Sequence, residues 1–127
     1  MKLRIRGNTV RLRVTQTELE SIEAGETVSE TTDFGGGHVL TYRLTVDPGA
    51  DAIGATFEDG IVTVRLPVRQ AAAWAGSDLV SLAGEQPASD GAGLAILVEK
   101  DFHCLAPREG EDESDMFPHP ETATGGC

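Results

Sequence analysis

The sequence predicts a β-rich α+β fold, in which two tandem ββαββ units form one compact, barrel-like pseudo-dimer followed by an acidic tail. Three observations lead to this class: short runs in which apolar and polar residues alternate, two-residue hairpin signals between such runs, and one short helical pattern in each half. We therefore expect a single globular domain over residues 1–104, with repeats at 1–46 and 52–104, and a largely disordered tail over residues 105–127.

The first two alternating runs, residues 2–6 and 9–14, predict a β-hairpin. Gly7-Asn8 between them is a two-residue loop with glycine first, and it places Arg6 opposite Thr9 and Arg4 opposite Arg11. The alternation puts five apolar side chains on a buried face, namely Leu3, Ile5, Val10, Leu12 and Val14. All five cations of the segment then share the other face, namely Lys2, Arg4, Arg6, Arg11 and Arg13.

A short helix and two more strands complete the first unit. Thr15 and Glu18 match a capping box, and Leu19 and Ile22 lie on one helical face. Ala24-Gly25 ends the predicted helix. Strands are then expected over residues 26–34 and 38–46, on either side of a glycine loop.

The second half repeats this order of elements. Asp59-Gly60 is a strong hairpin signal, and Phe57 and Trp74 are expected in the core. Eight residues from 9 to 16, TVRLRVTQ, match TVRLPVRQ at 63–70 in six positions, an offset of 54 that favours duplication. The expected elements are strands over 55–58 and 61–66, a helix over 68–75, and strands over 79–83 and 94–102 joined by a loop over 84–93.

The charge of the chain is divided unevenly. The formal net charge is −11, from 10 Lys and Arg residues against 21 Asp and Glu residues, yet residues 1–13 hold five cations and no acid. Like charges opposite each other across strands destabilise a hairpin, so this basic face needs an anionic neighbour. Three neighbours are considered: nucleic-acid phosphate, an acidic protein such as a toxin, and the chain's own carboxylates, either from residues 26–33 or from the acidic run at 108–115.

The residues that could hold a metal lie near the C-terminus. Cysteine and histidine suit zinc, and carboxylates suit harder cations, but no spacing typical of a metal site is present. Cys104 and Cys127 do not form a disulfide framework, and no nucleophile or phosphate-loop motif occurs. The sequence therefore predicts a non-enzyme without a cofactor. The weak metal candidates are Asp101, His103, Cys104, Asp115 and His119.

Two family resemblances accompany these patterns. IRGNTVRLRVTQTELESIEAGETV resembles the swapped-hairpin domain of AbrB- and MazE-type regulators, and DGIVTVRLPVRQAAAWAGSDLVSL resembles it again. In that family two ββαββ units interlock and the dimer binds DNA or a toxin, which implies an intrachain pseudo-dimer over about residues 1–102. MKLRIRGNTVRLRVTQTEL together with VEKDFHCL and EDESD is also similar to a family of small uncharacterised bacterial proteins.

The function that these observations favour is a non-catalytic binding module for a protein partner. The alternatives are a DNA-binding regulator or antitoxin that uses the five N-terminal cations, and a metal-binding protein that uses the region of His103 and Cys104. Nucleic acid is possible but disfavoured by the net charge. No apolar run reaches the roughly 18 residues of a membrane helix, so we expect a cytoplasmic protein without a membrane partner.

Overall fold

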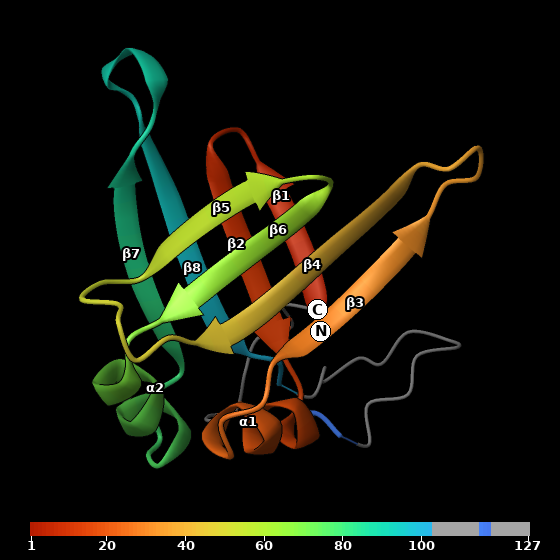
Figure 1. Ribbon diagram of the computed structural model, residues 1–127. Helices are drawn as coiled ribbons and strands as arrows, with labels where there is room; N and C mark the ends of the chain where they lie inside the picture. Colours follow the sequence, from red (N-terminus) through yellow and green to blue (C-terminus); the bar gives the residue numbers. More distant parts are fainter. Residues whose placement is uncertain (103–114, 118–127) are drawn as a thin grey trace.

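The computed structural model describes residues 1–102 and 115–117, and Figure 1 shows their arrangement. Two four-stranded sheets face each other, and both α-helices lie at the same end of the molecule. Neither of these helices is long and apolar enough to cross a membrane. The elements are β1 (Lys2–Arg6), β2 (Thr9–Val14), α1 (Gln16–Glu23), β3 (Val28–Asp33), β4 (Val39–Val46), β5 (Gly54–Glu58), β6 (Ile61–Leu66), α2 (Val68–Ala75), β7 (Ser81–Pro87), a 3₁₀ turn (Ser89–Gly91) and β8 (Gly93–Lys100).

Each sheet combines one hairpin from the first half of the chain with one from the second half. The first sheet has the strand order β1-β2-β8-β7, and the second has the order β3-β4-β6-β5. Parallel pairing of β2 with β8, and of β4 with β6, joins the hairpins. The expected β-rich fold is confirmed, but the strands of the described residues form two separate sheets and do not close into a barrel.

Both predicted hairpin turns are present with the predicted chemistry. Gly7 has φ +53°, and β1 pairs with β2 in the predicted register from Arg6–Thr9 to Lys2–Arg13. Asp59 and Gly60 have φ +52° and +75°, the left-handed pair that a type I′ turn requires. Because a two-residue loop leaves little freedom, it determines which residues face each other along the whole hairpin.

The helices begin where the sequence indicates. Thr15 caps α1 through a capping box in which its hydroxyl accepts from the Glu18 backbone and Glu18 Oε1 accepts from the Thr15 backbone at 2.9 Å. Pro67 takes the corresponding place before α2 without a side-chain hydrogen bond. Trp74 is fully buried, and its indole N–H donates to the Val80 carbonyl at 3.1 Å. The polar atom of the largest core side chain is therefore satisfied.

For the first hairpin and the helix of each half, the spacing between corresponding elements differs from the spacing of the matching letters. β5 begins 52 residues after β1, β6 begins 52 residues after β2, and α2 begins 52 residues after α1. At this spacing the buried pair Leu19 and Ile22 of α1 corresponds to Ala71 and Trp74 of α2. The six identical letters, offset by 54, are displaced by two residues along the strand, a shift that keeps every side chain on the same face.

Several sequence predictions need correction. The predicted loop over 84–93 is strand at both ends, since β7 continues to Pro87 and β8 starts at Gly93. Ile5 and Phe57 were expected in the core, yet they are 59% and 69% exposed. Both lie on the inner faces of their sheets, but at an end where the opposite sheet does not cover them.

A short C-terminal segment packs against the domain. Met116 is buried, and the Gln16 side chain donates to its carbonyl at 2.8 Å. The Phe102 and Phe117 rings meet edge to face with their centroids 5.7 Å apart. The predicted domain boundary after residue 104 and the rest of the predicted tail lie outside the described residues, so that division stays a prediction.

Candidate functional site

The predicted basic face lies on the outer surface of the first sheet, and part of it is neutralised there. Glu99 of β8 lies between two arginines of β2, with Oε1 accepting from Arg13 Nε at 2.5 Å and Oε2 accepting from Arg11 Nη2 at 3.3 Å. Arg11 Nε is 2.7 Å from Oε1 but its N–H does not point at that oxygen. Lys2 Nζ is 3.2 Å from Asp101 Oδ2.

The carboxylates that neutralise the face differ from the ones the sequence suggested. Residues 26–33 were one expected source. The acidic run at 108–115 was another, but only Asp115 of that run lies within the described residues, so this source stays a prediction. Glu99 instead comes from β8, which lies beside β2 in a parallel pair, and Asp101 directly follows the end of β8. Both carboxylates are nearly buried, at 9% and 6% exposure. Sequence separation hid this partner, because the register Arg13–Glu99 joins residues 86 positions apart.

Arg4 and Arg6 are the two cations of the face that have no carboxylate partner within the described part of the chain. Both are exposed on β1, which is an edge strand of the first sheet. Ile5 lies between them in sequence and points to the opposite face. Among the described residues, the uncompensated charge of this face is therefore concentrated on one edge strand, and an exposed apolar side chain lies on the other side of the same strand.

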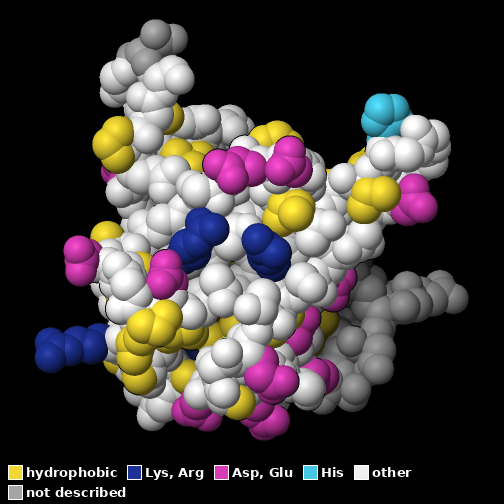
Figure 2. Space-filling view, in the orientation of Figure 1, with side chains coloured by type: hydrophobic (Ala, Val, Ile, Leu, Met, Phe, Trp, Pro, Cys, Tyr) yellow, Lys and Arg dark blue, Asp and Glu magenta, His cyan; other side chains and the backbone are white. Residues whose placement is uncertain are grey.

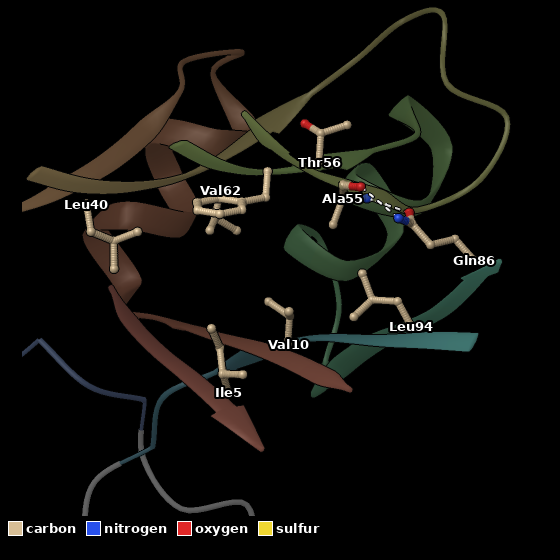
Figure 3. A pocket seen from close by; sticks show the side chains of 9 residues that line it. Ile5, Val10, Leu40, Ala55, Thr56, Val62, Gln86 and Leu94 are labelled. Carbon is tan, nitrogen blue, oxygen red and sulfur yellow. Dashed lines mark hydrogen bonds between the residues drawn. The ribbon is translucent and has the colours of Figure 1, made fainter. Parts of the chain in front are cut away.

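An apolar cleft of about 350 Å³ opens between the two sheets at this end. Figure 3 shows Ile5, Val10 and Leu94 of the first sheet facing Leu40 and Val62 of the second. Phe57 of β5 adds a ring that is 69% exposed. The sequence assigned Ile5 and Val10 to the buried face of the first hairpin and Phe57 to the core, and it contained no signal that would separate the covered end of the inter-sheet space from the open one.

Gln86 closes one side of the cleft. Its side-chain amide spans from β7 to the edge of β5, where Nε2 donates to the Ala55 carbonyl and Oε1 accepts from the Ala55 N–H, both at 2.7 Å (Figure 3). The amide therefore satisfies the backbone groups that a neighbouring strand would otherwise satisfy. The two hydrogen bonds of Gln86 thus connect the edge strands β5 and β7 of the two sheets. The cleft opens on the other side, toward β1.

Two ionisable groups, the partly buried Tyr42 and the buried Lys100, lie near the other end of β1 and at the end of β8. Burial raises the pKa of Tyr42, and the carboxylates of Glu30 and Glu18 raise it further. The Tyr42 hydroxyl donates to the Met1 carbonyl at 3.3 Å. Burial lowers the pKa of Lys100, and Asp78 opposes this effect. Lys100 Nζ donates to the Ser77 carbonyl at 2.7 Å.

Two of the predicted metal-binding candidates, Asp101 and Asp115, lie within the described residues, and the structure does not place them in a common metal site. Asp101 pairs with Lys2, and Asp115 Oδ1 accepts from the backbone and hydroxyl of Thr17 at the start of α1. Residues 1–102 and 115–117 contain no cluster of three or more metal-ligating side chains. His103, Cys104 and His119 lie outside the described residues, so the metal-site hypothesis is not tested on them.

Comparison with known proteins gives a family but no activity. No curated protein and no solved structure matches the chain. The model of DUF7009, a family of unknown function, matches residues 1–121. Because this match extends over nearly the whole sequence and includes the β1 edge and the cleft, the chain belongs to the DUF7009 family.

Proposed function

We propose that this domain is a protein-binding module that adds an extended segment of a partner to the open edge of β1. The observation that carries the proposal is the combination found on this one strand. Exposed Ile5 faces the apolar cleft, and Arg4 and Arg6, which have no carboxylate partner among the described residues, face the other side. An extended partner with alternating apolar and acidic residues matches both faces at once.

The backbone of β1 supports this mode of binding. In a two-residue hairpin the residues next to the loop, Arg6 and Thr9, form a hydrogen-bonded pair, and the pairs alternate from there. The N–H and C=O groups of Leu3 and Ile5 therefore point away from β2. Among the described strands none pairs with β1 on that side. An incoming strand finds main-chain partners at these two residues.

The test is titration with a synthetic peptide in which glutamate and valine alternate. Nuclear magnetic resonance should show saturable shifts of the Leu3 and Ile5 amides and of residues lining the cleft. Ile5→Ser should weaken binding by about tenfold to a hundredfold, because an isoleucine side chain that becomes buried in the complex is worth roughly 1.5–3 kcal/mol. Arg4→Gln should weaken it and flatten its dependence on salt.

Matched controls lie on α2, away from the cleft. Val68→Ser removes an apolar side chain of similar exposure, and Arg69→Gln removes one charge from an exposed site. Both should leave the affinity unchanged. Equal binding of a scrambled peptide with the same composition, or equal losses in the control variants, would show that the edge of β1 is not the site.

We also propose that the two halves arose by duplication and correspond to the interlocked units of AbrB- and MazE-type proteins. The recurrence of elements at a spacing of 52 supports this, as does the exchange of hairpins between sheets. The DNA-binding activity of that family is the second candidate function. DNA binding would depend on Arg4 and Arg6, because the other three cations of the basic face form ion pairs with Glu99 and Asp101. A duplex library that shows no mobility shift at low salt would exclude it.

A further inference from the structure

The outer face of the second sheet carries a cluster of hydrogen-bond donors that the sequence did not single out. It consists of Arg43 on β4, Thr63 and Arg65 on β6, and Thr56 on β5, and we call it the arginine–threonine cluster. Arg43 lies opposite Thr63, and Thr56 lies opposite Thr63 from the other side. Figure 2 shows basic side chains side by side near the centre of this face.

The hydrogen bonds within the cluster leave its donors available to a ligand. Arg43 Nε donates to Thr63 Oγ1 at 2.8 Å, and Arg65 Nη1 donates to Thr56 Oγ1 at 2.9 Å. Each hydroxyl oxygen thus accepts from a guanidinium group. The exposed Thr56 hydroxyl can donate its own proton to a ligand, whereas Thr63 is 3% exposed and positions Arg43. The remaining guanidinium N–H groups are donors as well. Neither arginine forms an ion pair with a carboxylate of the described residues.

Comparison with the first sheet shows what this cluster lacks. In the parallel pair of the first sheet, Arg13 of β2 lies opposite Glu99 of β8. In the parallel pair of the second sheet, Arg65 of β6 lies opposite Thr45 of β4. One sheet therefore supplies an internal carboxylate at a position where the other supplies a hydroxyl.

We infer that the arginine–threonine cluster binds an external oxyanion of the phosphate class. The two guanidinium groups have donors only, and together with the exposed Thr56 hydroxyl they suit a tetrahedral anion with several acceptor oxygens. Glu58 is the carboxylate of β5 on this face, and it lies opposite Ile61, toward the far end of the strand from Arg65. This inference is separate from the proposed partner site, because Arg43 and Arg65 do not line the cleft; Thr56 is the member of the cluster that also lines it.

The experiment is titration of the full chain with inorganic phosphate and, in a second arm, with glycerol 3-phosphate, at constant ionic strength set by chloride. Saturable shifts of the Arg43 and Arg65 side-chain N–H signals are expected. Arg65→Gln should weaken binding about tenfold or more, because charge-assisted hydrogen bonds are the strong ones. Tighter binding of glycerol 3-phosphate would assign the site to a phosphate monoester, and equal binding would assign it to the free anion.

A second variant tests the comparison between the sheets directly. Thr45→Glu places a carboxylate opposite Arg65, as Glu99 is placed opposite Arg13, and it should abolish anion binding with both arginines retained. Thr45→Gln is the matched control, since both variants lose the hydrogen bond between Thr45 and Thr27. Shifts no larger than those from chloride, or equal binding by Thr45→Glu and Thr45→Gln, would overturn the inference.

Discussion

Replacing Glu99 by glutamine tests whether one carboxylate neutralises the basic face from within the fold. The substitution keeps the size and one acceptor oxygen of the side chain and removes its charge. Arg11 and Arg13 then lose their anionic partner, and Arg4 still lies opposite Arg11 across the hairpin. Three guanidinium groups are left close together without a counter-charge from the described residues. The folded state should therefore become less stable.

The expected loss follows from how far each partner is exposed to water. The Glu99 side chain is 11% exposed, and those of Arg11 and Arg13 are 30% and 31% exposed. Breaking a fully buried pair costs about 3–5 kcal/mol, and an exposed pair contributes about 1 kcal/mol or less. A nearly buried acid between two partly solvated bases lies between these limits. We expect a loss of about 2 kcal/mol, which lowers the Tm by about 8 °C in a domain of this size.

Thermal and urea unfolding measure this loss, with Glu85→Gln as the control. Glu85 is an exposed glutamate of the same sheet and forms no ion pair with a described residue. Added salt should restore part of the stability of the Glu99 variant by screening the arginines. Arg11→Gln introduced into that variant should also raise its stability. A loss no greater than that of Glu85→Gln would refute the neutralisation of this face by Glu99.

Three further predictions concern other parts of the fold. Thr15→Ala should lower the free energy of unfolding by about 1 kcal/mol in urea titration, because α1 loses its capping hydroxyl. The pKa of Tyr42 is raised in the folded state. Above the ordinary tyrosine pKa of 10.0, the unfolded state therefore loses a proton that the folded state retains, and the free energy of unfolding should fall as the pH rises. Tyr42→Phe should remove this part of the alkaline loss. Gln86→Ala should speed hydrogen exchange of the Ala55 amide, and unchanged exchange would show that the amide contact does not hold the two edges together.

The sequence predicted those features that depend on neighbours close along the chain. The register of β1 with β2 follows from a two-residue loop, and the start of α1 follows from the four residues Thr15–Glu18. It did not predict the partner of Arg13, because parallel pairing brings β8 to β2 from the other end of the domain. No local pattern contains that information.

The errors at the candidate site have a common physical cause. The alternation of apolar and polar residues predicts on which face of a strand a side chain lies. How deeply that side chain is buried depends on whether the opposite sheet extends over its position. Val10 and Ile5 lie opposite each other on the same inner face, yet Val10 is 8% exposed and Ile5 is 59% exposed. Gly84–Pro87 was predicted as loop from its composition. It is strand because it pairs with β8, and Gln86 binds the backbone of β5.

Arg4 and Arg6 could serve a second role besides partner binding, namely the protection of the β1 edge strand against self-association. One experiment gives opposite results for these two roles. Charged side chains on an edge strand hinder its pairing with another copy of the chain. If Arg4 and Arg6 serve only this purpose, Arg4→Gln with Arg6→Gln should raise self-association in analytical ultracentrifugation and leave peptide affinity unchanged. The proposed partner site instead requires a loss of affinity for the alternating acidic peptide. At Ala55 the edge of β5 is already satisfied by Gln86, so the same substitutions should not change the pairing of that edge.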